Sequence, residues 1–384
     1  MYVGIDAGIN HCICIKDDDG KILNKFFINN SKNDYGKLTS LIDRTAKICI
    51  EDTGTYSLLI YSFLSKQGYD IKRINSFKAE KLRQFLNDNV KTDSKDAEFL
   101  ADLRKIKDDF IIKDITNNIE LKKLSRLYDF MVHYQSKVKN KLIDELFRVC
   151  PELKSKFSRK LSVTSLRLLE HFGVKGIQKN SFECLCKYSK DHMLGLHYSV
   201  IKKIKDAFTQ TVGISKKDYI NLNSLITLYF DNQNNIDNMV KKLKEMIDNS
   251  EYKNLLTLPG INVITASVII GEIGNVMRFD NCKQIVKFAG LDVKITQSGS
   301  KRGHIVLSKR GNSRIRKTLF MTTLKFIGIK NKNKFKGFYE RLKAKNKQSF
   351  TCISAVSRKI LIWLYFEMVR CHTKKGYVHK VIYS

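Results

Sequence analysis

Acidic residues are scarce in this chain of 384 residues. Asp and Glu together number 38 against 70 Lys and Arg, which gives a formal net charge of +32 and a sequence pI near 9.7. A basic surplus of this size indicates a polyanionic partner, with nucleic acid as the first choice and an anionic membrane surface as the second.

Long apolar runs are also lacking. Spanning a bilayer takes roughly 18 to 20 apolar residues, whereas the best candidate, ILIWLYFEMV at 360–369, is short and is interrupted by Glu367. The first residues, MYVGIDAGIN, carry no basic leader and reach an acid at Asp6. We therefore expect a cytoplasmic protein without membrane contact.

Paired cysteine motifs are missing as well. The nine cysteines are an odd number, and none forms a C-x-x-C pair; Cys12 and Cys14, like Cys184 and Cys186, have the spacing of one face of a strand. This argues against zinc and against disulfides. The chain nevertheless has 43% hydrophobic residues, enough for a globular protein of two or three domains.

The first part of the chain, 1–112, alternates strand and helix patterns. MYVGIDAG, HCICIKDDDG and KILNKFFINN predict an antiparallel meander, and KICIED and DIKRI predict two further strands. Helices are expected at about 32–46, 55–67, 77–89 and 94–107. The order β-β-β-α-β-α-β-α predicts an α/β domain, a mixed sheet covered by helices.

The middle part, 113–250, is predicted to be all-α. Apolar residues recur every three or four positions from Leu124 to Val149, before Pro151. A second long helix has heptad spacing from Leu222 to Met246, with Asn232 at one seam position. Such a seam favours a coiled coil between chains slightly over an antiparallel hairpin within one chain.

The last part, 251–384, is again predicted to be helical. LLTLPGINVITASVIIGEIG places Pro259 and Gly260 between apolar segments. This composition suits a helix-hairpin-helix turn, whose backbone amides can hold a phosphate, or a plain helical turn.

Acidic residues follow two predicted strands and begin one predicted helix. Asp6 ends the first strand, Glu51 and Asp52 end the fourth, and Asp93 and Asp96 lie in KTDSKDAEFLADL. One interpretation is local, with Asp93 as a helix cap and Asp96 as a first-turn acid. The other is that the carboxyl ends of neighbouring strands gather four acids, which Mg²⁺ would neutralise.

Three ordered blocks carry a family resemblance. GID, EDTG and KTDSKDA are similar to the blocks of the RuvC-like (RNase H-like) domain in DEDD transposases of bacterial insertion sequences, relatives of the Piv-type DNA invertases. LPGINVITASVIIGEIG, QSGSKRGHIVLSKRGNSRIRKTLF and FKGFYERLKAKNKQSF resemble that family's C-terminal transposase domain. The resemblance implies four Mg²⁺-binding acids at Asp6, Glu51, Asp93 and Asp96. Asp52 is not among them, because on a strand it faces away from Glu51.

The resemblance also implies a serine nucleophile in the C-terminal part, joined covalently to the DNA phosphate. The family commonly has Ser-Ser-Gly where this chain has Gln297, Ser298 and Gly299, so Ser298 is the candidate, with Ser300 and Ser308 as competitors. A bare hydroxyl is a poor nucleophile, so this role requires activation by the metal site, in the same or another subunit.

A basic segment without acids surrounds this serine. Phosphate contacts, which position a backbone without reading sequence, are expected from a set of seven residues: Lys301, Arg302, Lys309, Arg310, Arg314, Arg316 and Lys317. The alternative is a solvated basic face. His304 is a lone histidine and gives only weak evidence for an acid or base.

The resemblance implies a DNA transposase and site-specific recombinase of a bacterial insertion sequence, which we expect in the cytoplasm. The resemblance implies donor and target DNA and a non-coding guide RNA as partners, and the heptads favour a homodimer that forms a tetramer on DNA. Two alternatives stay open: a RuvC-like junction nuclease without a covalent intermediate, and a non-catalytic nucleic-acid-binding protein.

Overall fold

The computed structural model describes residues 1–74, 76–85, 92–106, 111–112, 118–153, 163–212, 219–295, 305–328 and 333–373. The chain folds as two compact units, Met1–Asn117 and Asn118–Ser384. Within the described ranges, no helix combines the length and the apolar character that crossing a membrane requires.

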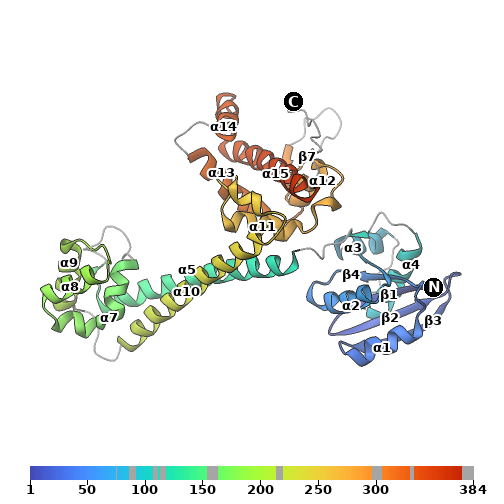
Figure 1. Cartoon of the computed structure of the whole chain (residues 1–384), viewed down its shortest axis with the longest axis horizontal. Coiled ribbons are helices and arrows are strands. Elements are labelled where there is room, and N and C mark those ends of the chain that lie inside the picture. The colour runs from blue at the N-terminus through green and yellow to red at the C-terminus, as the bar shows by residue number, and fades with distance from the viewer. Residues whose placement is uncertain are drawn as a thin grey trace. The chain divides into compact units, whose positions relative to one another are not determined.

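The first unit is a mixed sheet with helices (Figure 1). Its elements are β1 (Tyr2–Ala7), β2 (Asn10–Lys16), β3 (Ile22–Asn29), α1 (Lys32–Leu41), β4 (Lys47–Glu51), α2 (Thr55–Lys66), β5 (Asp70–Ile74), α3 (Ser76–Phe85), α4 (Asp93–Ile106) and β6 (Ile111–Ile112). The strand order is β3-β2-β1-β4-β5-β6. The meander β1-β2-β3 is antiparallel, and β4 runs parallel to β1 and β5. The predicted mixed α/β sheet is thereby confirmed, and its order is consistent with an RNase H-like start.

Helix α4 packs directly on the centre of this sheet because β1 carries glycine at that point. A Cβ atom on Gly4 would overlap the backbone of Ala97 and Ala101 in α4. Only a residue without a side chain permits this approach. Gly4 therefore sets how closely α4 packs on β1.

The second unit is mostly helical (Figure 1). Its elements are α5 (Ile119–Val149), α7 (Val163–Lys179), α8 (Phe182–Asp191), α9 (Tyr198–Thr209), α10 (Tyr219–Asp248), η2 (Lys253–Thr257), α11 (Val263–Ile273), η3 (Val276–Arg278), α12 (Cys282–Ala289), β7 (Val293–Ile295), β8 (Ile305–Leu307), α13 (Ser313–Gly328), α14 (Lys334–Ala344) and α15 (Ser349–Thr373). The hairpin β7-β8 departs from the prediction of a purely helical C-terminal part. Strands of three residues are too short to show a periodicity in sequence.

The two long helices α5 and α10 lie side by side as an antiparallel pair within one chain (Figure 1). Leu222, near the start of α10, shares a hydrophobic core with Val149 at the end of α5, and Leu243 shares another with Leu121. Asn232 donates to Gln135 Oε1 at 2.7 Å and to the Met131 carbonyl at 3.2 Å. The heptad seam is thus occupied inside the chain, which is the alternative that the pattern favoured less.

Two separate hydrophobic cores lie in the second unit. One joins α7, α8 and α9 to the C-terminal part of α5 and the N-terminal part of α10. The other joins α11, α12, α13 and α15 to the N-terminal part of α5 and the C-terminal part of α10. The long hairpin therefore connects two packed bodies. The predicted domain borders at residues 112 and 250 stay predictions.

Candidate functional site

Two acids lie at the same edge of the sheet in the first unit. Strands β1 and β4 are parallel, and their register pairs Ile5 with Ile50. Asp6 and Glu51 are the next residue of each strand. Parallel neighbours bring their carboxyl ends together, so the two carboxylates end up side by side.

Helix α4 adds two further acids. Asp96 is buried, with 6% of its surface exposed, whereas Asp93 is exposed. Neither is needed as a cap, because the Thr92 hydroxyl accepts from the Lys95 amide at 3.3 Å. The local interpretation of Asp93 as the helix cap is therefore wrong, whereas Asp96 does lie in the first turn of α4, as that interpretation expected.

The pKa of Asp6 records the convergence of all four acids. Burial, followed by the negative charges of Asp96, Glu51 and Asp93, raises its pKa from 3.8 to about 6, and the nearby Arg83 opposes this rise. Like charges disfavour ionisation only at short range. The structure thus brings the four predicted acids into one electrostatic cluster.

Arg83 of α3 is the cation that compensates this cluster, and the sequence patterns did not reveal it. Its Nη2 lies 2.6 Å from Glu51 Oε2, and its Nε lies 3.4 Å from Asp96 Oδ1. The side chain is 12% exposed and its guanidinium lies over the Phe99 ring, 5.3 Å from the centroid. A single arginine on a helix has no spacing signature, so only the fold shows its partners.

Asp52 belongs to a different pair. Its carboxylate faces Arg73, with Oδ1 at 3.8 Å from Nη1, and its amide donates to the Ile74 carbonyl at 2.9 Å. Glu51 and Asp52 therefore contact different arginines.

The cluster suits a hard cation through its charge and its oxygen donors, although Arg83 now holds two of its members. Within the part of the chain that the structure describes, no three acidic, histidine or cysteine side chains stand in a geometry that would hold a metal ion. Carboxylate oxygens are the donors that hard divalent cations bind. Binding by Glu51 and Asp96 together would require Arg83 to release them.

The candidate nucleophile Ser298 and its competitor Ser300 lie outside the described residues, as do His304, Lys301 and Arg302. Ser308 is described. Its hydroxyl donates to the Asp292 carboxylate and its amide donates to the Asp292 carbonyl at 2.9 Å. These contacts fasten the end of β8 to the residue before β7, which gives Ser308 a structural task in the hairpin.

The described basic residues of this segment differ in how far their charges are used within the chain. Arg314 pairs with Asp129 at 2.5 Å and with Glu272 at 3.2 Å, and Arg316 donates to the Ala289 carbonyl at 2.9 Å. Lys309, Arg310 and Lys317 are exposed. Phosphate contacts therefore suit these three best, because Arg314 is already neutralised.

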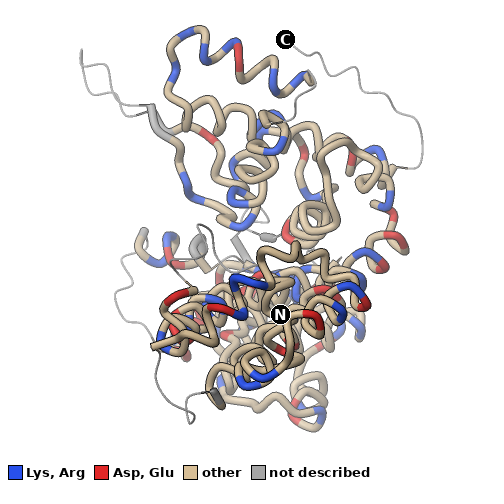
Figure 2. The backbone as a smooth tube through the Cα atoms, turned by 90° about the vertical axis from the view of Figure 1, so that its left-hand side faces the viewer, with Lys and Arg blue, Asp and Glu red and all other residues tan. Residues whose placement is uncertain are grey.

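Further basic residues lie on and after α14. Arg341 and Lys343 are in its last turn, Lys345 and Lys347 follow, and all four are exposed. Figure 2 shows Lys and Arg spread over the described helices. The spacing in RLKAKNK contains this signal, so the sequence was sufficient to find it.

The predicted turn at Pro259 and Gly260 is present, with Gly260 at φ +79°. The element before it is a 3-10 helix of five residues, and a Cβ on Gly260 would lie 2.7 Å from the Phe326 ring. Asn262 then caps α11 by accepting from the Thr265 amide at 2.9 Å. The turn is thus held against the core, and its use as a phosphate site stays a prediction.

The strongly basic balance of the chain indicates a protein that binds nucleic acid. A model of IS110-type DEDD transposases, described as Transposase, matches residues 3–151, and one described as Transposase IS116/IS110/IS902 family matches residues 252–340. The chain belongs to the IS110/IS116 family of transposases.

Individual relatives agree with this family. The chain is 20% identical over 337 residues to the insertion element IS116 uncharacterized 44.8 kDa protein of Streptomyces clavuligerus, covering 84% of this chain and 83% of the relative. It is 21% identical to the insertion element IS110 uncharacterized 43.6 kDa protein of Streptomyces coelicolor, over 96% of this chain and 94% of that relative. The transposase for insertion sequence element IS1111A of Coxiella burnetii is 24% identical, over 42% of this chain and 47% of the relative.

Proposed function

We propose that this transposase is a site-specific DNA recombinase in which Asp6, Glu51, Asp93 and Asp96 hold Mg²⁺ and Ser298 is the nucleophile. The observation that carries the proposal is the position of the other acids around Asp6, whose pKa is raised to about 6 by burial first and then by the charges of Asp96, Glu51 and Asp93. When bound, Mg²⁺ supplies Lewis-acid stabilisation of the charge on the scissile phosphate and on the leaving oxygen.

The residues of the chain divide the chemistry between them. The Ser298 hydroxyl loses its proton to a base and attacks the phosphorus, so that one Ser-O-P bond forms while one bond from phosphorus to a deoxyribose oxygen breaks. The departing oxygen takes up a proton. A hydroxyl of the exchanged DNA strand later attacks the phosphoserine, which restores the serine and rejoins the DNA without an energy source.

Arg83 has a defined task before the ion binds. It neutralises Glu51 and Asp96, and it has to release them if both are to become ligands. The exposed cations Lys309, Arg310 and Lys317 contact the phosphate backbone without reading bases. Reading of sequence then falls to pairing with a guide RNA encoded by the element. Recombination of two duplexes needs several active sites, so a dimer that pairs into a tetramer on DNA is expected, through a surface other than the α10 seam.

Strand exchange on a DNA substrate tests this function. Asp93→Ala, Asp96→Ala and Ser298→Ala should each abolish exchange, and Ser300→Ala and Ser308→Ala should keep it. Full activity in any of the first three variants would remove that residue from the mechanism.

Trapping of a covalent protein-DNA adduct separates the recombinase from its alternatives. An adduct that is lost in Ser298→Ala supports the covalent route. Mg²⁺-dependent hydrolysis without any adduct would indicate a RuvC-like junction nuclease, and binding without Mg²⁺-dependent chemistry would indicate a non-catalytic nucleic-acid-binding protein.

A further inference from the structure

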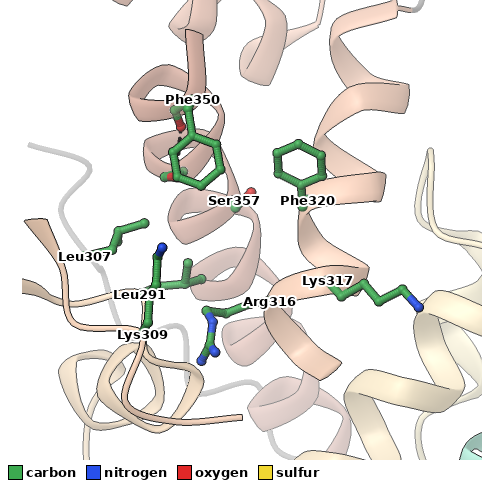
Figure 3. Close-up of a pocket in the computed structure, with 9 residues that line it drawn as sticks. Leu291, Leu307, Lys309, Arg316, Lys317, Phe320, Phe350 and Ser357 are labelled. Atoms are coloured by element: carbon green, nitrogen blue, oxygen red, sulfur yellow. Dashed lines mark hydrogen bonds between the residues drawn. The ribbon is translucent and has the colours of Figure 1, made fainter. Parts of the chain in front are cut away.

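A cavity of about 200 Å³ lies beside the β7-β8 hairpin in the second unit (Figure 3). Its walls come from the end of α12, from β8, from α13 and from α15. The residues that line it are Leu291, Leu307, Lys309, Arg316, Lys317, Phe320, Phe350, Ser354 and Ser357. Pockets for drug-sized ligands measure about 300 to 1,000 Å³, so this cavity has room only for a smaller group, such as one ring system.

The two ends of the cavity differ in chemistry. Phe320 and Phe350 lie at one end above Ser357, and Lys309 and Arg316 lie toward the other (Figure 3). The phenyl centroids are 6.2 Å apart with the rings tilted by 38°, and Phe350 remains 56% exposed. An exposed aromatic face beside cations accepts a nucleobase by stacking and the attached phosphate by charge.

The cationic end is built into the fold. The Arg316 guanidinium is fixed by its bond to the Ala289 carbonyl at 2.9 Å, and a Cβ on Gly290 would lie 2.6 Å from Arg316 Nη1. Lys309 is exposed with φ +51°, and Lys317 is also exposed. None of the described side chains that line the cavity is acidic.

We propose that this cavity binds one unpaired nucleotide of single-stranded DNA, with its base against Phe350 and Phe320 and its phosphate near Lys309 and Arg316. The proposal rests on the proposed function, since strand exchange is the step that frees DNA nucleotides from pairing. Duplex DNA does not fit, because the faces of its bases are covered by the base pairs stacked above and below. The cavity borders the hairpin whose strands lead into and out of the segment with Ser298.

Fluorescence anisotropy tests this binding with a labelled oligo(dT) and a strand of equal length built from abasic nucleotides, in EDTA so that no cleavage occurs. Both strands carry the same phosphates, so the ratio of their affinities isolates the bases. Wild type should favour oligo(dT) by about tenfold, the scale of one base-aromatic stack. Phe350→Leu combined with Phe320→Leu should bring the ratio toward one.

Two controls keep the result specific. Phe130→Leu removes another exposed phenyl, 63% exposed on α5 and outside the cavity, and should leave the ratio unchanged. Lys317→Gln should lower the affinity for oligo(dT) and for the abasic strand by the same factor. An unchanged ratio in the double phenylalanine variant would overturn the proposal, as would a similar loss in Phe130→Leu.

Other occupants give other results. If oligo(rU) showed the phenylalanine-dependent preference and oligo(dT) did not, the cavity would belong to RNA and the assignment to DNA would be wrong. A change of oligomeric state in the double variant, with unchanged DNA binding, would make the cavity a contact between chains and overturn the proposal. The assay needs neither Mg²⁺ nor Ser298, so failure of the recombinase mechanism would show separately, as loss of adduct formation.

Discussion

Arg83 neutralises acids that are far apart in sequence. Glu51 ends β4 and Asp96 lies in α4, and the same guanidinium pairs with both. Removing one member of such a pair leaves the remaining charges without compensation. The stability of the first unit should therefore depend on whether some cation, arginine or metal, occupies this place.

Arg83→Gln tests this dependence. Without divalent ions it should lower the free energy of unfolding by about 1 to 3 kcal/mol. Added Mg²⁺ should recover more stability in the variant than in wild type, because the ion then has no competitor. Thermal unfolding with and without MgCl₂ measures both effects.

Two variants serve as controls for Arg83→Gln. Arg83→Lys keeps the charge, so its unfolding temperature should lie between those of Arg83→Gln and wild type. Arg341 is exposed in the second unit, so Arg341→Gln should leave the unfolding temperature unchanged. If Arg83→Gln unfolds like wild type in both buffers, the arginine does not compensate the acids.

Asp6→Asn should stabilise the protein in the absence of divalent ions at neutral pH. The folded-state pKa of Asp6 is raised from 3.8 to about 6, so its ionised form is disfavoured in the native state. The resulting loss of folding stability is absent below pH 3.8, grows between pH 3.8 and about 6, and is complete above that pH. The gain in unfolding temperature of the variant should accordingly increase across this pH window and then level off.

The neighbouring acid supplies the matched control for Asp6→Asn. Asp52→Asn removes a carboxylate that faces Arg73, so it should give no stabilisation at any pH in this window. Equal curves for Asp6→Asn and wild type would show that neither burial nor the neighbouring acids disfavour the ionised form of Asp6.

At the scale of elements, Gly4 decides where α4 and its two acids lie. Gly4→Ala forces β1 and α4 apart, because the new methyl group would overlap the backbone of Ala97 and Ala101. Overpacking of this kind costs about 1 to 3 kcal/mol, and more where backbone has to move. We expect a lower unfolding midpoint in urea and a weaker affinity for divalent ions.

Gly36→Ala is the control for this substitution. Gly36 is inside α1, and a Cβ there meets no atom within 4 Å. Alanine is favoured over glycine in a helix by about 1 kcal/mol, so this variant should be as stable as wild type or more so. A Gly4→Ala protein that matched it would contradict the close packing of α4 on β1.

Strands β1 to β5 were predictable because each has a run of apolar or alternating residues bounded by polar turns. Strands β6, β7 and β8 have two or three residues, too few for any pattern. The heptads of α10 predicted a buried face correctly. They did not identify its partner, because α5 offers the same kind of seam within the chain as a second chain would.

The candidate site was predictable to a similar extent. Asp6 and Glu51 could be brought together from sequence because strand ends share an edge. Arg83, Gly4 and the partner of Asp52 depend on packing between distant segments, which no local pattern records. The charges of Lys309 and Arg314 look alike in sequence, yet only Arg314 is neutralised by acids from α5 and α11.

The net charge of +32 has a consequence for the whole molecule. Association with DNA should release counterions, so the logarithm of the binding constant should fall linearly with the logarithm of the salt concentration. Lys317→Gln should reduce that slope by about one, measured by titration of a labelled duplex at several salt concentrations. Lys37→Gln should change it little, because Asp34 lies 3.4 Å from the Lys37 ammonium. A slope unaffected by Lys317→Gln would remove this residue from the interface.

Calorimetric titration of the full chain with Mn²⁺ tests the four-acid site most directly. Wild type should bind the ion with a defined stoichiometry, and Asp6→Asn, Glu51→Gln, Asp93→Asn and Asp96→Asn should each weaken binding by about tenfold or more, whereas Asp52→Asn should bind like wild type. Unchanged binding in the four variants, or a loss confined to Asp52→Asn, would contradict a shared cation site at the end of β1 and β4.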